Sequence, residues 1–321
     1  MRAVVITRAG GPEVLELQDV PEPEPGPWDI KVAVRASALN RADVLQRRGL
    51  YAPPPGVPAA VPGLELAGVV EVVGAHVTRW RVGDEVMAIV GGGANADKVV
   101  LHEREALRAP RGLDLVRAAA LPEAFMTAFD AAVLQGGLAS GQWLAVNAVG
   151  SGVGTAAVQL ARALGARVIG SARTPDKITR AEALVLAHGG DDLVAVARAA
   201  GVKASVLLDL VGGPGLAQAL EVVRPQGTIV LVGLLGGAKA ELPLGLVLQR
   251  RLRLVGTVLR SRPIEEKITL ARAFEDRVVP LIESGALAPI VDRVLPLAAI
   301  ADGHRALEAG ETFGKVVIDH A

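Results

Sequence analysis

The sequence predicts an α/β protein with two domains, one β-rich and the other built on a doubly wound parallel sheet. The chain has 321 residues, which corresponds to two domains at roughly 150 residues each. Its first hundred residues contain short β-branched runs separated by proline and glycine, a pattern typical of a β-rich domain. From about Leu113, apolar runs of strand length alternate with helical patterns, which indicates parallel strands covered by helices on both faces.

The predicted strands of the β-rich part cover residues 3–7, 14–20, 30–36, 66–73 and 85–90. A short helix is expected over 40–48, where Gly49 stops it. Residues 21–27 alternate proline with glutamate and glycine, and they predict an exposed, extended loop.

The second part is predicted to alternate strands and helices. Helices are expected to begin at Asp114 and Pro122 and to cover 153–164 and 174–187, the last capped by Thr174. Its strands are predicted at 143–147, 167–170, 206–211, 228–232 and 252–258. A strand near 293–297, a helix near 298–309 and a strand at 315–319 are expected to return to the β-rich part. We therefore place the β-rich domain at 1–118 and 283–321, and the parallel-sheet domain at 119–282.

The composition excludes several classes of protein. There is no cysteine, which excludes disulfide scaffolds, cysteine metal sites and thiol catalysis. The 34 basic residues are balanced by 34 acidic ones, whereas nucleic-acid binders usually have a basic excess. The start of the chain lacks a signal-peptide pattern, and the longest uncharged stretch, 131–161, contains too many polar and glycine residues for a membrane span. We expect a cytoplasmic location with neither nucleic acid nor membrane as a partner.

A glycine-rich turn follows the predicted strand at 143–147. In the run VGSGVG over 149–154, small residues allow a close backbone approach, and the following helix presents free N–H groups to an anion. Gly150, Ser151, Gly152 and Val153 are therefore candidate contacts for a dinucleotide pyrophosphate. The standard G-x-G-x-x-G spacing would also require glycine at 149 and 151, so an ordinary strand–turn–helix remains an alternative.

The next predicted strand ends without the acidic residue that NAD-specific folds place on the ribose 2′-hydroxyl. Ser171, Arg173 and Lys177 follow it instead, and this combination suits a 2′-phosphate. The alternative is that Arg173 and Lys177 are ordinary solvated charges at a helix start.

Two residues of the β-rich part are candidates for chemistry. Asn40 lies at the end of a predicted strand and at the start of the predicted helix over 40–48. The alternative to a functional role is that it serves only as the N-cap of this helix. Tyr51 is the only tyrosine and the only phenol that could donate a proton to a reduced oxygen, although a lone loop tyrosine usually has a packing role.

Several motifs, spread in order over nearly the whole chain, carry a family resemblance. They are ASALNRAD at 36–43, Gln46-Arg47, Tyr51, PPPG at 53–56, PGLELAG at 62–68, PEA at 122–124, SGVGTA at 151–156, LRSR at 259–262 and Gly314-Lys315. With these motifs the chain resembles the medium-chain dehydrogenase/reductase superfamily, and within it the zinc-free NADPH:quinone oxidoreductases of the tumour-suppressor-inducible branch. The resemblance implies a Rossmann domain that binds NADPH and a β-rich, GroES-like catalytic domain.

The resemblance also implies roles for individual residues. Asn40 would line the nicotinamide pocket, Tyr51 would border the substrate cleft, and Thr127 would approach the nicotinamide ribose. The remaining cofactor contacts implied are Gly150, Ser151, Gly152 and Val153 at the pyrophosphate, Ser171, Arg173 and Lys177 at the adenosine phosphate, Gly233, Leu234 and Leu235 along the nicotinamide, and Arg260, Gly314 and Lys315 closing over the cofactor. One departure is that residues 187–192 lack the tyrosine with which this branch contacts the adenosine ribose.

Zinc-containing members of the superfamily carry cysteine ligands and a Gly-His-Glu motif. Here the corresponding residues are Gly63-Leu64-Glu65, so no metal site is expected. The histidines show no ligand spacing; they are His76, His102, His188, His304 and His320.

Together these features predict an NADPH-dependent quinone oxidoreductase that transfers hydride to a quinone or a similar conjugated acceptor, with Tyr51 or water supplying the proton. An enoyl or alkenal double-bond reductase on the same scaffold is one alternative. An NADPH-binding structural or sensor protein with little turnover is another. The family implies a homodimer formed through the sheet edge of the cofactor domain.

Overall fold

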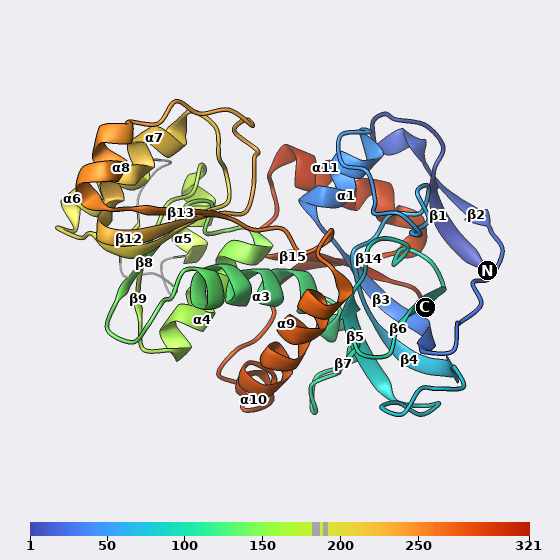
Figure 1. Ribbon diagram of the computed structural model, residues 1–321. Helices are drawn as coiled ribbons and strands as arrows, with labels where there is room; N and C mark the ends of the chain where they lie inside the picture. The colour runs from blue at the N-terminus through green and yellow to red at the C-terminus, as the bar shows by residue number, and fades with distance from the viewer. Residues whose placement is uncertain (182–186, 189–191) are drawn as a thin grey trace. The chain divides into compact units, whose positions relative to one another are not determined.

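The computed structural model describes residues 1–181, 187–188 and 192–321. Contacts divide the chain into two compact units, one formed by Met1–Met126 with Leu259–Ala321 and the other by Thr127–Val258 (Figure 1). The predicted boundaries differ, because they assign 119–126 and 259–282 to the parallel-sheet domain. In the structure, Arg272 in the 259–282 segment donates to the carbonyl oxygen of Ala106 (2.6 Å), and the backbone N–H of Glu123 donates to Glu65 (2.7 Å).

The first unit is built around a mixed sheet. Among the described residues, seven strands run in the order β14-β15-β3-β4-β5-β7, with β6 also paired to β3. A separate antiparallel pair is formed by β1 and β2. The strand bounds are β1 Arg2–Ile6, β2 Leu15–Asp19, β3 Asp29–Leu39, β4 Glu65–Val73, β5 Glu85–Ile89, β6 Lys98–His102, β7 Leu107–Arg108, β14 Val291–Pro296 and β15 Lys315–Asp319. The C-terminal strands thus return to the β-rich part as predicted, since β15 pairs antiparallel with β3.

Helices fill the rest of this unit. They are η1 Pro12–Val14, α1 Arg41–Arg47, α2 Leu115–Ala118, α3 Pro122–Ala128 (which runs into the second unit), α9 Ile264–Arg277, α10 Val279–Glu283, η4 Leu297–Ala299 and α11 Ile300–Ala309. The helix predicted to begin at Asp114 is α2, and Asp114 is its N-cap, since its side chain accepts from the Arg117 N–H. Helices α9 and α10 and the short strands β6 and β7 were not predicted.

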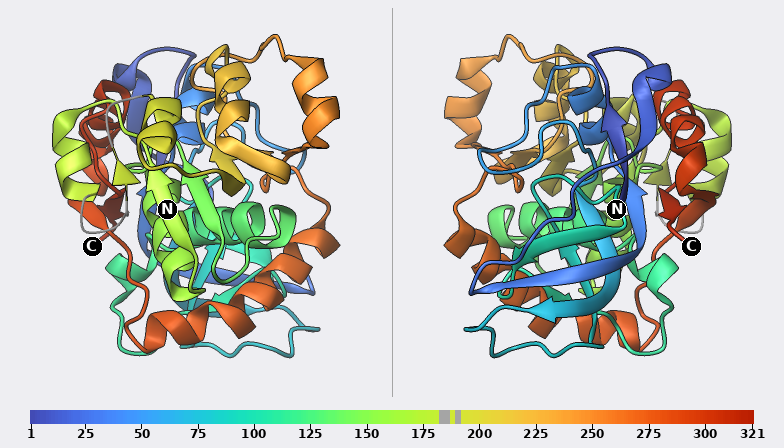
Figure 2. Two further views of the ribbon diagram at one scale, coloured as in Figure 1. Left: turned by 90° about the vertical axis from the view of Figure 1, so that its left-hand side faces the viewer. Right: turned by 90° about the vertical axis from the view of Figure 1, so that its right-hand side faces the viewer.

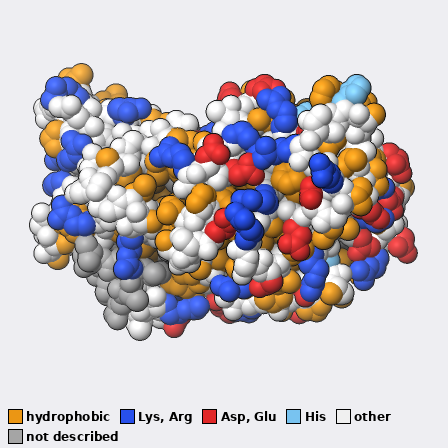
Figure 3. Space-filling model, turned by 90° about the horizontal axis from the view of Figure 1, so that it is seen from below, with side chains coloured by type: hydrophobic (Ala, Val, Ile, Leu, Met, Phe, Trp, Pro, Cys, Tyr) orange, Lys and Arg blue, Asp and Glu red, His pale blue; other side chains and the backbone are white. Residues whose placement is uncertain are grey.

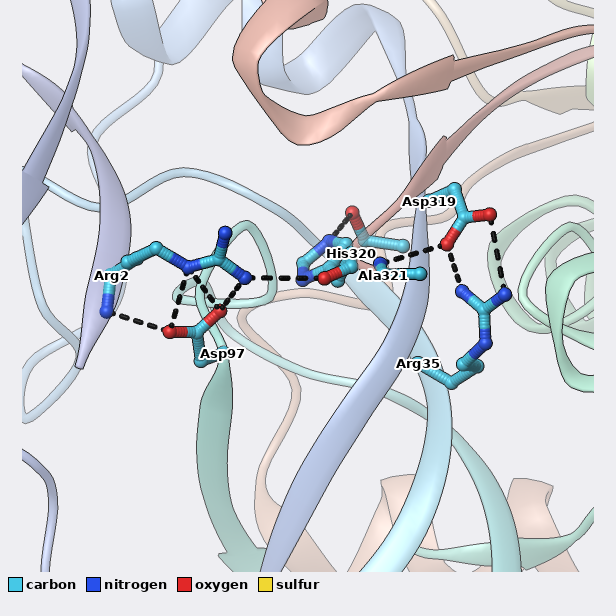
Figure 4. A network of polar contacts seen from close by, with 7 residues as sticks. Arg2, Arg35, Asp97, Asp319, His320 and Ala321 are labelled. Atoms are coloured by element: carbon cyan, nitrogen blue, oxygen red, sulfur yellow. Dashed lines mark hydrogen bonds and ion pairs between the residues drawn. The ribbon is translucent and has the colours of Figure 1, made fainter.

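The two ends of the chain meet in this unit (Figure 4). Arg2 forms an ion pair with Asp97 (3.0 Å) and donates to the carbonyl oxygen of His320 (3.2 Å), while Arg35 pairs with Asp319. The C-terminal residues are therefore tied to β1 and β3.

The second unit contains a parallel sheet of six described strands in the order β10-β9-β8-β11-β12-β13. This order, with the first strand central, is that of the doubly wound dinucleotide-binding fold. Its strands are β8 Trp143–Val146, β9 Arg167–Gly170, β10 Ala187–His188, β11 Ala204–Asp209, β12 Val223–Leu231 and β13 Arg253–Gly256. The predicted parallel sheet is confirmed.

Helices cover both faces of this sheet (Figures 1 and 2). Ala145, Ile169, Leu207 and Ile229 lie in register on one face and pack in one core cluster with residues of α6, α7 and η3. The helices are η2 Phe129–Gln135 (a π-helix), α4 Gly152–Ala163, α5 Pro175–Ala181, α6 Leu193–Ala199, α7 Gly215–Ala219, η3 Leu220–Val222 and α8 Leu244–Arg250. The helix predicted over 174–187 is described as far as Ala181, and residues 182–186 lie outside the described residues.

Two further observations bear on partners. Among the described residues, no helix is long and apolar enough to cross a membrane. Acidic and basic side chains intermingle over much of the face drawn in Figure 3, in agreement with the zero net charge.

Candidate functional site

The loop between β8 and α4 has the geometry of an anion site. Ser151 caps α4, and its Oγ accepts from the Gly154 N–H at 3.0 Å. Because α4 begins at Gly152, the N–H groups of Gly152 and Val153 have no acceptor within the helix. These donors, with the positive end of the helix dipole, suit the phosphate oxygens of a dinucleotide.

Close packing in this loop explains its small residues. A Cβ at Gly154 would lie 2.5 Å from the Ala148 carbonyl oxygen, so only glycine lets the helix approach the loop this closely. A Cβ at Gly170 would lie 2.1 Å from Val149, which fills the space above the end of β9. Ala148 takes the left-handed conformation with φ +55°, and Gly150 follows two residues later. The loop therefore departs from the standard glycine spacing, yet it keeps the close helix–strand contact that the third glycine serves.

The candidate adenosine-phosphate residues follow β9. Ser171 is buried, and its carbonyl oxygen accepts from the Val149 N–H (3.0 Å), which ties it to the glycine-rich loop. Arg173 is exposed, and Lys177 lies half-buried in the first turns of α5. Of the segment 187–192, in which the adenosine-side tyrosine is missing, residues 189–191 lie outside the described residues.

A second loop is held at the carboxyl end of β11 by residues that the sequence reasoning missed. Asp209 Oδ1 accepts from Asn147 Nδ2 (2.5 Å) and from the N–H groups of Val211 and Gly212 (both 2.9 Å). Asn147 in turn accepts from the Leu210 N–H at 2.7 Å. Asn147 follows β8, and Asp209 is the last residue of β11. These two strands are neighbours in the sheet, and the strand order reverses between them. Polar residues at two adjacent strand ends were the signal that could have identified them.

The remaining predicted residues of this unit lie at its other loops and at its start. Gly233 follows β12, and a Cβ there would lie 2.4 Å from the Leu210 carbonyl oxygen. Leu234 and Leu235 are 59% and 55% exposed, an unusual state for leucine. The Thr127 hydroxyl is buried and has no hydrogen-bond partner in the described chain, so its capacity to donate and accept a hydrogen bond is unused. The residues of this unit therefore fit a dinucleotide cofactor.

In the first unit, Asn40 is held from two sides. Its Nδ2 donates to Glu65 (2.9 Å) and its Oδ1 accepts from Lys315 Nζ (2.6 Å). Lys315 also pairs with Glu65 (2.6 Å) and donates to the Leu39 carbonyl oxygen (2.9 Å). Because both partners are buried, this network fixes the orientation of the Asn40 amide.

Asn40 also occupies the N-cap position of α1, the structural alternative considered for it. Its backbone N–H donates to Asp43 (2.7 Å), whose other oxygen accepts from the Gly63 N–H (2.9 Å). Asn40 and Asp43 thus form a capping box at the start of α1, and the Asn40 side chain also contacts Glu65 and Lys315. Burial raises the pKa of Asp43 to about 6, although these two hydrogen bonds oppose the shift.

Arg260 organises the loop that carries Tyr51. Its guanidinium lies over the Tyr51 ring (5.0 Å to the centroid) and donates to the carbonyl oxygens of Gly91 (2.7 Å) and Tyr51 (3.3 Å). It also donates to Gln46 at 2.5 Å. Burial raises the pKa of Tyr51, while the charge of Arg260 acts in the opposite direction. Arg260 thus joins the Tyr51 loop to α1.

The sequence reasoning overlooked the acidic side of this cluster. Glu65 and Glu123 appeared only inside family motifs, yet Glu65 Oε2 accepts from the Glu123 N–H. Gly314 has φ +88°, and a Cβ there would lie 2.2 Å from the Ile290 carbonyl oxygen, so a glycine is needed beside Lys315. The unit brings Asn40 and Lys315 into direct contact, and Tyr51 with Arg260.

Residues that could ligate a metal do not gather in the described part of the chain. No group of three or more histidine, aspartate or glutamate side chains with suitable geometry occurs there. Leu64 is 2% exposed and contributes an apolar side chain next to Glu65.

Comparisons with known proteins assign this fold to a family. The profile "Alcohol dehydrogenase GroES-like domain" matches residues 26–111, and the profile "Zinc-binding dehydrogenase" matches residues 152–275. A quinone oxidoreductase of Pseudomonas aeruginosa is 34% identical over 96% of this chain and 96% of its own length. The chain belongs to the medium-chain dehydrogenase/reductase superfamily.

Solved structures of this superfamily match the whole chain. The quinone oxidoreductase of Escherichia coli complexed with NADPH is 28% identical, covers 100% of both chains and has a TM-score of 0.87. A structure described as an NAD-dependent alcohol dehydrogenase is 34% identical, covers 100% of both chains and has a TM-score of 0.85. The predicted fold, with a GroES-like part and a parallel sheet, is confirmed. The superfamily assignment makes this protein an oxidoreductase with quinone oxidoreductases among its relatives.

Proposed function

We propose that this superfamily member is an NADPH-dependent quinone oxidoreductase that transfers hydride without a metal ion. The observation that carries the proposal is full-length similarity to a quinone oxidoreductase, together with a second unit that fits a dinucleotide. When bound, NADPH would supply the hydride, and the protein contributes binding, orientation and proton management.

Three sets of residues in the second unit would hold the cofactor. The N–H groups of Gly152 and Val153, with Ser151, would hold the pyrophosphate. The unpaired Thr127 hydroxyl would bind a ribose hydroxyl. Gly233 and the exposed Leu234 and Leu235 would lie along the nicotinamide, where apolar side chains exclude water.

The preference for NADPH rests on the residues after β9. No acidic side chain stands at the end of that strand, and the exposed Arg173 and nearby Lys177 can pair with a 2′-phosphate. Two charge-assisted hydrogen bonds at about 1.5–3 kcal/mol each would favour NADPH by roughly 10²-fold or more, at about 1.4 kcal/mol per decade. Because one similar structure is named for NAD and another for NADPH, the ratio of the two affinities must be measured.

Metal-independent chemistry is supported by the residues of the first unit. The chain has no cysteine, and Leu64 stands where zinc members carry histidine. A quinone is a strong electrophile, so its reduction does not need a Lewis acid. In the first unit, Asn40 offers an amide whose orientation is fixed, and Tyr51 offers a phenol.

The experiment is steady-state oxidation of NADPH and NADH by the purified protein, with an ortho-quinone and a 2-alkenal as alternative acceptors. We expect turnover of the quinone, a preference for NADPH and no change on treatment with EDTA. Faster reduction of the alkenal would favour a double-bond reductase, and NADPH binding without turnover would favour a structural or sensor role. The variant Arg173→Glu/Lys177→Glu should lose the NADPH preference, and an unchanged ratio would refute this account of specificity.

Association and location belong to the same proposal. Strand β13 lies at a sheet edge and has no buried residue, and Leu244 and Leu248 on the neighbouring α8 are 73% and 78% exposed. An open strand edge beside exposed leucines suits pairing with a second copy in a homodimer. We propose such a homodimer, with a cytoplasmic location.

A further inference from the structure

Glu123 lies beside the buried network that holds Asn40. It stands in the first turn of α3, and its backbone N–H donates to Glu65 Oε2 at 2.7 Å. The other oxygen of Glu65 binds Asn40 and Lys315. Glu65 therefore connects the start of α3, where Glu123 lies, with Asn40 and Lys315.

The same carboxyl group also interacts with the Tyr51 loop. After burial, the groups that shift its pKa are Glu65 on β4, Lys315 on β15, Asp43 on α1 and Arg260 in the segment before α9. The raised pKa of the Tyr51 phenol is due first to burial, and the charge of Glu123 contributes to it. Glu123 therefore interacts electrostatically both with the Asn40 network and with the Tyr51 loop.

The hydrogen bonds single out Glu123 among the three acids. Glu65 is paired with Lys315 and Asn40, and Asp43 accepts from two backbone N–H groups. No group in the described chain donates a hydrogen bond to the Glu123 carboxyl group. The two cations nearby are bonded elsewhere, since Lys315 binds Glu65 and Asn40, and Arg260 donates to Gln46 and to backbone carbonyl oxygens. The acid that receives no hydrogen bond is therefore the one that keeps its proton.

We propose that Glu123 supplies the proton that the acceptor takes up as it is reduced, an inference that rests on the function proposed above. The acceptor gains two electrons with the hydride, and the oxygen that becomes electron-rich forms a bond to the Glu123 proton as the carboxyl O–H bond breaks. The resulting carboxylate is reprotonated from solvent, which the partial exposure of Glu123 permits. One hydride and one proton reduce a quinone to its hydroquinone, so the step balances.

Glu123 is better suited to this role than the phenol. Burial, followed by repulsion from Glu65, raises the pKa of Glu123 to about 8, which is close to the working pH at which a general acid is most effective. Burial raises the pKa of Tyr51 above that of an ordinary phenol, so its proton is held more tightly. Tyr51 then orients the acceptor or passes on the proton rather than being its source.

The test compares Glu123→Gln and Glu123→Asp with the wild type and with the control Glu105→Gln. Glu105 is also an acid whose pKa is raised by burial, but it pairs with Lys267 (3.5 Å) and not with the Asn40 network. The kcat for quinone reduction at saturating NADPH is measured from pH 6 to 10. In parallel, the Glu123 carboxyl group is titrated by ¹³C NMR in protein labelled at the glutamate carboxyl carbon, with Glu123→Gln providing the assignment.

We expect the wild-type kcat to fall as the pH rises through about 8, because the protonated acid is then lost. Glu123→Gln should lower kcat by about 10²-fold or more and abolish this pH dependence, while Glu123→Asp should restore part of both. Glu105→Gln should retain the wild-type profile. A Glu123 resonance that titrates near the value of a free glutamate would overturn the proposal, as would a Glu123→Gln enzyme with unchanged kcat and pH profile. A wild-type enzyme that does not reduce quinones would refute both the proposed function and the role of Glu123 as proton donor. If the wild type reduces quinones but Glu123 titrates like a free glutamate, only the role of Glu123 is refuted.

Discussion

His320 makes the stability of the first unit sensitive to acid. Its imidazole is 6% exposed, and Nε2 lies 2.9 Å from the Ser37 hydroxyl, which is bonded to Asn95. Its Nδ1 is buried without a hydrogen-bond partner in the described chain. Around it, Arg2 and Asp97 tie the two chain ends together (Figure 4). The perturbation to test is His320→Gln, which keeps a polar side chain beside Ser37 and removes the titrating ring.

The size of the effect follows from the pKa. Burial lowers the pKa of His320 from 6.5 to about 4, so the unfolded chain takes up its proton first as the pH falls. The stabilisation is therefore present above pH 6.5 and is lost as the pH falls towards 4. By proton linkage, His320 lowers the free energy of unfolding by about 0.2 kcal/mol at pH 7 and by about 2 kcal/mol at pH 5, relative to high pH.

The assay is urea unfolding at pH 7 and pH 5, followed by tryptophan fluorescence. Trp143 lies in the second unit, so a Trp143→Phe background leaves Trp28 and Trp80 as reporters of the first. The stability advantage of the wild type over His320→Gln should shrink by about 2 kcal/mol between pH 7 and pH 5. His76→Gln, at an exposed position, is the control for loss of an imidazole. An advantage that is equal at the two pH values would refute the reasoning.

Four further variants test the packing and pairing described above. Gly154→Ala forces a Cβ to within 2.5 Å of the Ala148 oxygen, so it should cost about 1–3 kcal/mol of stability and weaken NADPH binding in calorimetry. Asn147→Ala leaves a backbone N–H without its acceptor and should lower the free energy of unfolding by about 1–3 kcal/mol. Lys315→Met leaves a buried carboxylate unpaired and should cost about 3–5 kcal/mol in urea unfolding. Leu248→Glu should convert the proposed dimer to a monomer in light scattering, without changing the circular dichroism spectrum.

The parallel sheet could be predicted because its strands carry local signals. The apolar runs at β8, β9 and β11 stand out in sequence, and all six residues of β11 are buried. Helix α9 gave a weaker signal, because it is rich in charges and its ion pairs reach residues far away in sequence, such as Glu265 with Arg104. Such pairs depend on tertiary packing and leave no periodic pattern in the chain.

The site was predictable only where a residue type is diagnostic on its own. The glycine-rich loop and the lone Tyr51 could be selected as candidates from their residue types, whereas Asn40 was selected through the family resemblance. Glu65 and Glu123 could not, since an isolated glutamate in a sequence is usually a solvated surface charge. Their proximity comes from a fold that places residues 40, 65, 123 and 315 side by side, with Glu65 and Lys315 buried.

The name of one matching profile gives no support for zinc in this chain. The profile "Zinc-binding dehydrogenase" covers residues 152–275, a segment with no cysteine, whereas the motif that carries a metal ligand in zinc members corresponds to Gly63-Leu64-Glu65, outside that match. At this motif the buried Leu64 cannot ligate, and the adjacent Glu65 is already paired with Lys315 and Asn40. A cation placed there would have to displace the Lys315 ammonium group from a buried carboxylate, which is costly. The positive charge that balances this carboxylate is thus supplied by the protein itself, and this supports hydride transfer without a metal.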